Sequence, residues 1–147
     1  MRRFLIGSTL AVLAATAMAA APALPVHKAP VDARVYIISP ADGASVGRDV
    51  TVRFGLAGMG VAPAGVEKEH TGHHHLLIDV ATLPVAGQPI PNDEHHRHFG
   101  GGQTETVLHL APGTHTLQLE LGDANHVPFD PPVVSRKITI HVRGNSE

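Results

Sequence analysis

The stretch THTLQLELG, residues 114–122, alternates apolar and polar side chains along almost its whole length. Successive side chains of a strand point to opposite faces of a sheet, so this alternation predicts a strand with one buried face. The apolar face would carry His115, Leu117, Leu119 and Leu121, and the polar face would carry Thr114, Thr116, Gln118 and Glu120. A strand with one face toward the core and one toward solvent is typical of antiparallel sheets.

The same kind of pattern recurs on both sides of this stretch. Residues 50–56 (VTVRFGL) and 133–142 (VVSRKITIHV) also alternate, and residues 34–38 (RVYII) are β-branched and aromatic. Residues 104–110 (TETVLHL) lead into the turn APGT, which predicts a hairpin over residues 104–121. About six or seven short strands separated by Gly and Pro turns predict an all-β fold, an immunoglobulin-like antiparallel β-sandwich. Its long His-, Gly- and Pro-rich loops would lie within residues 58–103 of a single domain spanning residues 34–143.

The two ends of the chain have a different composition. Residues 1–23 start with two arginines near the N-terminus, continue with an apolar stretch and end in small residues, which predicts a signal peptide cleaved after Ala19, Ala21 or Ala23. The alternative is an uncleaved membrane anchor, because the apolar stretch approaches spanning length. We expect cleavage, a periplasmic or secreted protein, and no stable membrane insertion afterwards. Residues 24–33 read as a short linker and residues 144–147 as a C-terminal tail.

The composition excludes several classes of function. The chain has no cysteine, so it has no disulfide, no thiolate zinc site and no blue-copper site. A formal net charge of -2, few aromatic residues and no basic cluster beyond the start of the chain argue against a nucleic-acid partner. Histidine is the unusual feature, with 12 residues in a chain of 147.

Two histidine clusters carry the candidate chemistry. In GHHHLLID, residues 72–79, strand alternation would place His74 on the core face with Leu76 and Ile78. His73 and His75 would then share the other face, where two imidazoles can converge on one ion. In EHHRHFGGGQTE, residues 94–105, His96 and His98 repeat this two-residue spacing next to three glycines.

A further histidine, His126, lies in the Pro-bounded loop GDANHVPFDPP, residues 122–132. Its neighbours Asp123, Asn125 and Asp130 fit an Asx-type turn before the last strand. Histidine and carboxylate ligands without thiols suit Zn(II), Cu(II) or Ni(II), and the ligand types alone do not choose among these ions. The candidate metal ligands are therefore five histidines on loops at one end of the sandwich: His73, His75, His96, His98 and His126.

The leading hypothesis is a non-enzymatic exported domain that binds a divalent transition metal, Zn(II) or Cu(II), through these histidines. A second hypothesis is a structural or interaction module of the cell envelope, in which buried histidines form a hydrogen-bond network. A third is a metal-dependent enzyme of cupin type, because His73, His75 and Asp79 resemble the first cupin motif with Asp in place of Glu.

Over residues 34–142 the chain resembles a family of exported bacterial proteins, domain of unknown function 4399. The segments that carry the resemblance are VYIISPADGASV, VTVRFGLAGMGVAPAGVEKEHTGHHHLLID, HFGGGQTET, PGTHTLQLELGD and HVPFDPPVVSRKITI, in this order. The family's histidine segments correspond to His73–His75, to His96 and His98, and to His126. Members often carry further histidines where this chain has Ala124 and Phe129. The resemblance implies the fold and export, and it implies no activity.

Overall fold

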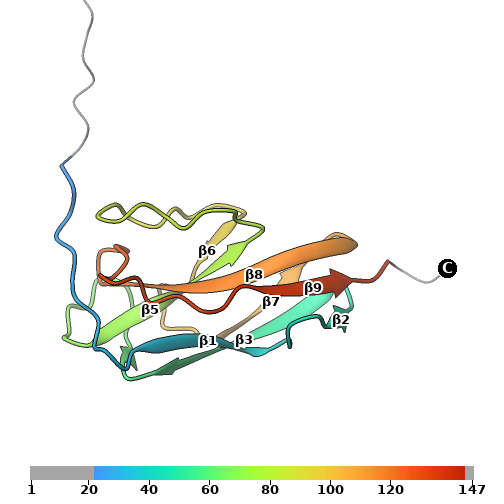
Figure 1. Cartoon of the computed structure of the whole chain (residues 1–147), viewed down its shortest axis with the longest axis horizontal. Coiled ribbons are helices and arrows are strands. Elements are labelled where there is room, and N and C mark those ends of the chain that lie inside the picture. The colour runs from blue at the N-terminus through green and yellow to red at the C-terminus, as the bar shows by residue number, and fades with distance from the viewer. Residues whose placement is uncertain (1–21, 145–147) are drawn as a thin grey trace, which may run out of the picture.

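The computed structural model describes residues 22–144, which form nine strands and contain no helix. The strands are β1 (Arg34–Ser39), β2 (Ser45–Val46), β3 (Asp49–Ala57), β4 (Gly60–Val61), β5 (Thr71–Ile78), β6 (His96–His98), β7 (Glu105–His109), β8 (Gly113–Gly122) and β9 (Ile138–Val142). Figure 1 shows the strands as two packed sheets. The predicted all-β sandwich is therefore confirmed.

One sheet has three strands in the order β1-β3-β7, and the other has six strands along the order β2-β9-β8-β5-β4, with β6 added beside β5. All pairs are antiparallel except the two-residue pairs β2–β9 and β4–β5, which are parallel. Strands β4 and β6 pair with successive parts of β5, at residues 71–72 and 75–77. Strand β5 therefore pairs with β8 as well as with β4 and β6.

The predicted hairpin over residues 104–121 is wrong. Strand β7 pairs with β3 in the smaller sheet, whereas β8 pairs with β5 and β9 in the larger one. The turn APGT therefore carries the chain from one sheet to the other. Alternation identified both strands, but it contains no information about which strands pair with each other.

The core lies between the two sheets and is built mainly from aliphatic side chains. Val52 of β3 and Leu117, Leu119 and Ile140 of the larger sheet are fully buried there. As predicted, the apolar faces of residues 50–56 and 114–122 supply much of this core. Phe54 and Phe99 pack together at its centre, with their ring centroids 4.9 Å apart.

The other face of the larger sheet is also covered. The segment between β5 and β6 lies over this sheet on the side away from the smaller sheet, and gives the molecule a third layer (Figure 1). Leu77 of β5, Ile90 of this segment and Val127 of the segment after β8 are buried without belonging to the core between the sheets. The backbone N–H of Ile90 donates to the carbonyl of His126 at 2.8 Å, which joins the two covering segments. Both faces of β5 are therefore out of solvent.

The segment predicted as a linker, residues 24–33, lies against the domain. The backbone N–H of Leu24 donates to the Gly87 carbonyl at 3.0 Å, and Lys28 forms an isolated bridge with Asp130. The predicted signal peptide, residues 1–23, lies almost entirely outside the described residues, as does most of the predicted tail, residues 144–147. Nowhere between residues 22 and 144 is there a helix long and apolar enough to span a membrane.

Candidate metal centre

Strand β5 divides the triple histidine between its two faces, as the alternation predicts. His74 points into the sandwich core, where its ring lies 5.2 Å from that of Phe54, measured between centroids. His73 and His75 are on the opposite face, and their ring centroids are 4.8 Å apart. All three side chains are fully buried. Two imidazoles are thus held side by side under the covering segments.

Strand β6 brings a third imidazole to this pair. In the register of β5 and β6, His98 lies opposite His75. The ring centroid of His98 is 5.1 Å from that of His75 and 5.0 Å from that of His73. Residues directly opposite in an antiparallel pair share a face, so this short strand fixes where the His98 ring lies.

The fourth imidazole comes from the loop after β8. His126 has a left-handed backbone, with φ at 67°. Its ring centroid is 4.6 Å from that of His98 and 5.1 Å from that of His73. The structure therefore brings together four of the five predicted ligands, and it places them on the outer face of the larger sheet rather than at one end of the sandwich.

Asp123 holds the His126 loop in this conformation. Its carboxylate Oδ1 accepts the backbone N–H of Asn125 at 2.8 Å and that of Val127 at 2.9 Å, the two neighbours of His126. Its carbonyl accepts the N–H of His126, and its own N–H donates to the carbonyl of Val127, both at 3.0 Å. Asp123 is therefore the turn residue that the sequence predicts, and this turn also positions a candidate ligand.

The spacing of the ring nitrogens suits a metal ion. His73, His98 and His126 each offer one nitrogen, and these three atoms lie within 4.8 Å of one another. Zn–N bonds of about 2.1 Å would hold ligating nitrogens about 3.5 Å apart, so a small closing motion of the rings would complete the site. His75 is the adjacent fourth imidazole, although its ring centroid is 6.1 Å from that of His126.

His73, His75 and His98 are desolvated, and most of their ring nitrogens have no hydrogen-bond partner within residues 22–144. Neither ring nitrogen of His73 or His75 has a hydrogen-bond partner among the described residues, and neither does Nε2 of His98. Burial lowers the pKa of His73 to about 4 and that of His75 to about 2, and it also lowers the pKa of His98. These rings are therefore neutral near pH 7 and have nitrogen lone pairs available for a cation.

Two glycines leave room for the imidazoles. A Cβ built on Gly100 would lie 2.6 Å from Nε2 of His98, and one on Gly122 would lie 2.7 Å from Cε1 of His75. Distances this short are not compatible with a side chain at either position. Within the glycine run at residues 100–102, Gly100 is therefore needed because the His98 ring lies so close to it. Gly102 is the one of the three with a positive φ.

His96 is the predicted ligand that the structure does not bring into the cluster. It lies opposite Leu77 in the β5–β6 register, two pairs further along than His98. Its Nδ1 lies 2.9 Å from a carboxylate oxygen of Asp93. The two-residue spacing does place His96 and His98 on one face, but it also separates their Cα atoms by about 6.5 Å along the strand.

Glu120 is a buried acidic group on the face of β8 that the sequence predicts to be polar. It is fully buried because the covering segments exclude solvent from that face, and it lies opposite His75 in the β5–β8 register. Neither carboxyl oxygen has a hydrogen-bond partner among the described residues. Burial raises the pKa of Glu120 to about 7. Only the register of β5 and β8, which the alternation does not supply, could have placed Glu120 beside a histidine.

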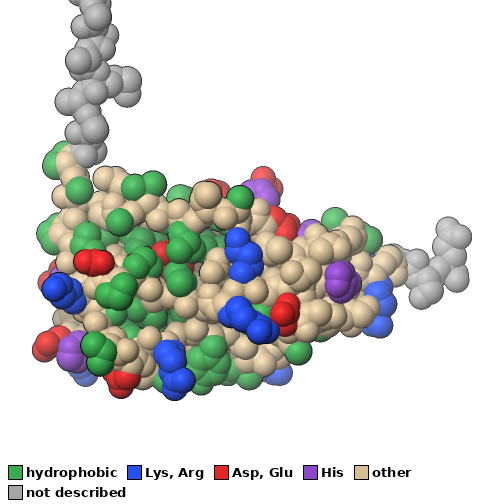
Figure 2. Space-filling view, in the orientation of Figure 1, with side chains coloured by type: hydrophobic (Ala, Val, Ile, Leu, Met, Phe, Trp, Pro, Cys, Tyr) green, Lys and Arg blue, Asp and Glu red, His purple; other side chains and the backbone are tan. Residues whose placement is uncertain are grey.

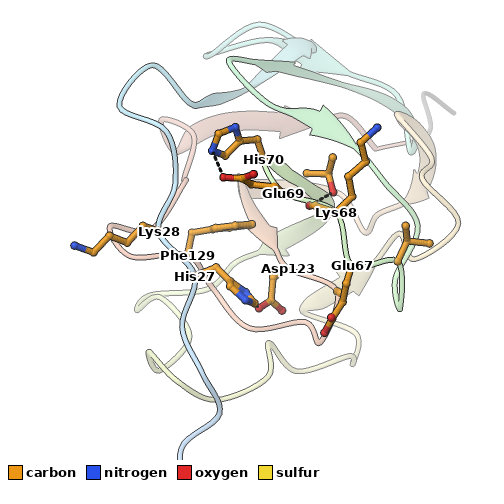
Figure 3. A pocket seen from close by; sticks show the side chains of 11 residues that line it. His27, Lys28, Glu67, Lys68, Glu69, His70, Asp123 and Phe129 are labelled. Carbon is orange, nitrogen blue, oxygen red and sulfur yellow. Dashed lines mark hydrogen bonds and ion pairs between the residues drawn. The ribbon is translucent and has the colours of Figure 1, made fainter.

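A cavity of about 440 Å³ lies next to the His126 turn. Asp123 lines it together with His27, whose Nδ1 is 2.8 Å from Oδ2 of Asp123, and with charged residues of the segment before β5 (Figure 3). Figure 2 shows only isolated histidines on the face drawn there, in contrast to the buried cluster.

The cupin-type arrangement is not formed. Asp79 does not join His73 and His75, because it follows the end of β5 and its carboxylate lies 2.7 Å from Nδ1 of His115. The group of possible ligands found among residues 22–144 consists of histidines only. His73, His75 and Asp79 therefore resemble the first cupin motif in sequence, but they do not form one metal site.

Comparison with known proteins identifies the family. No curated protein and no solved structure was found to match the chain. The sequence model of the family described as domain of unknown function, DUF4399, matches residues 52–143, which is more than half of the chain and includes all four clustered histidines. This chain therefore belongs to the DUF4399 family.

Proposed function

We propose that this chain is an exported, non-enzymatic protein that binds a divalent transition metal ion, Zn(II) or Cu(II). His73, His98 and His126 are three of the ligands, and His75, whose ring lies against those of His73 and His98, is the fourth. The observation that carries this proposal is the convergence of three ring nitrogens, from three separate segments of the chain, to within 4.8 Å.

The ligand chemistry supports the ion class. Imidazole suits Zn(II), Cu(II) and Ni(II), and a closed zinc site has four protein ligands. A set of neutral nitrogens without any thiolate is also consistent with an oxidising compartment, where an exposed thiol would be at risk of oxidation. The signal-like start of the chain supports a periplasmic or secreted location.

The unpaired state of the rings favours metal binding over the second hypothesis, a purely structural histidine network. Such a network would satisfy the buried nitrogens with hydrogen bonds, because a buried polar group without a partner costs about 1–3 kcal/mol. His73 and His75 have no such bonds among the described residues. A bound cation would satisfy at least one nitrogen of each ligand.

Calorimetric titration of the chelator-stripped protein with Zn(II) and Cu(II) tests the proposal. We expect at least one ion to bind with a Kd tighter than about 10 μM, equivalent to about 7 kcal/mol. H98A should abolish this binding, because His98 is a ligand at the edge of the cluster. H96A is the matched control, since His96 is two residues away on the same strand and outside the cluster. Absence of binding to the wild-type protein, or equal losses in H96A and H98A, would show that the proposal is wrong.

A further inference from the structure

Glu120 is the one fully buried acidic side chain in the part of the chain that the structure describes. It lies at one end of a row that runs across three strands, from His98 of β6 through His75 of β5 to Glu120 of β8. Directly opposite residues in an antiparallel pair have Cβ atoms about 5 Å apart, so a change of side-chain rotamer is enough to bring the carboxyl group to the His75 ring.

Both partners in this pair are unsatisfied. The two ring nitrogens of His75 and the two oxygens of Glu120 all lack hydrogen-bond partners among residues 22–144. An imidazole that binds a metal through one nitrogen almost always donates its other N–H to a carboxylate, a carbonyl or water. Asp123, the other acidic residue near the cluster, already accepts hydrogen bonds from Asn125 and Val127 and contacts His27. Glu120 is the carboxyl group that remains free.

We propose that Glu120 is a specificity-determining residue of the metal site: it accepts the N–H of His75 in the loaded protein and makes the site selective for divalent over monovalent cations. This inference rests on the proposed function. Four histidines supply only neutral nitrogen ligands, so a divalent ion would place two uncompensated positive charges in a buried environment. One carboxylate next to the ligands offsets half of that charge. A monovalent ion of similar ligand preference needs this compensation much less.

The cost of Glu120 to the unloaded protein supports a functional role. A buried carboxyl group without hydrogen bonds destabilises the folded state, and replacing it with a neutral group of the same shape is commonly neutral or stabilising. If Glu120 only supported the fold, its replacement would instead lower the stability of the metal-free protein. The effect of the substitution on stability therefore distinguishes the two roles.

The test compares E120Q with wild type, using Zn(II) as the divalent probe and Ag(I) as the monovalent probe, each titrated by calorimetry. We expect the Kd for Zn(II) to rise about 10- to 100-fold, as is typical when a carboxylate partner of a ligand is lost, and the Kd for Ag(I) to stay within about twofold. The melting temperature of the metal-free E120Q protein should equal or exceed that of wild type. E105Q is the matched control, because Glu105 is exposed in the smaller sheet and pairs with Arg53.

Two results would overturn the inference: unchanged zinc affinity in E120Q, or equal losses for Zn(II) and Ag(I) with a lower melting temperature. If E120Q does not fold, E120L provides the same comparison without a polar group. If the wild-type protein binds neither ion, the proposed function is wrong. If the wild-type protein binds zinc and E120Q binds it equally well, only the role of Glu120 is wrong.

Discussion

Asp123 and His126 form a closed backbone turn, in which the N–H of His126 donates to the carbonyl of Asp123 at 3.0 Å. The Asp123 carboxylate completes this turn by accepting the N–H groups on either side of His126. His126 keeps a left-handed backbone here, with φ at 67°, which is uncommon for a residue other than glycine. The position of one candidate ligand thus depends on a single carboxylate.

We predict that D123A weakens zinc binding at least tenfold and lowers the free energy of unfolding by about 1–2 kcal/mol, because the turn loses its side-chain acceptor. D79A is the control. Like Asp123, Asp79 accepts a backbone N–H through its carboxylate, that of Thr116 at 2.8 Å, and it lies away from the cluster. It should lower stability to a similar degree and leave zinc affinity unchanged. Equal zinc affinity in D123A and wild type, measured by calorimetry, would contradict a positioning role for Asp123.

Gly100 should tolerate no side chain in the loaded protein. A Cβ at this position would lie 2.6 Å from Nε2 of His98, so G100A must displace the ring or the backbone. We expect zinc affinity to fall about tenfold or more, since overpacking of this kind commonly costs about 1–3 kcal/mol. G47A is the matched control, because nothing lies within 4 Å of a Cβ at Gly47. If G100A and G47A bind zinc equally well, the ring of His98 does not need the space at Gly100.

The metal-free protein should lose stability as the pH falls from about 6.5 to 4.5. Burial lowers the pKa values of His73 and His74 to about 4 and that of His75 to about 2, so these histidines take up protons near pH 6.5 only when the chain is unfolded. Glu120 acts in the opposite direction, because burial raises its pKa to about 7 and it is protonated first in the folded state. The three histidines outweigh Glu120, and His98, whose pKa burial also lowers, acts in the same direction as they do. The unfolded chain therefore carries at least about two more protons, which corresponds to a loss of roughly 2–3 kcal/mol per pH unit.

Urea denaturation at pH 7, 6 and 5 in the presence of a chelator measures this slope. H74L should flatten it by about one proton, because His74 lies in the sandwich core and outside the metal cluster. The same variant should leave zinc binding unchanged. A stability that is constant or rises toward pH 5 would mean that the buried histidines do not remain neutral in the folded protein.

Much of the fold was predictable because its cause is local. Alternation along residues 50–56 and 114–122 reflects burial of one strand face, and it also separated His74 from His73 and His75 correctly. Pairing was not predictable, since β7 and β8 are adjacent in sequence but lie in different sheets. The same lack of register information placed His96 among the ligands and Glu120 in solvent. The places of both residues depend on how β5 pairs with β6 and with β8.

Because both faces of β5 are buried and carry different side chains, this strand must pair with β8 in one register. A slip of one residue against β8 would exchange the two faces, so that His74 would reach the outer layer while His73 and His75 entered the apolar interior. The slipped strand would offer one imidazole where the native strand offers two. A bound ion would therefore lock the alignment of β5, and it would penalise misfolded pairings during assembly of the larger sheet.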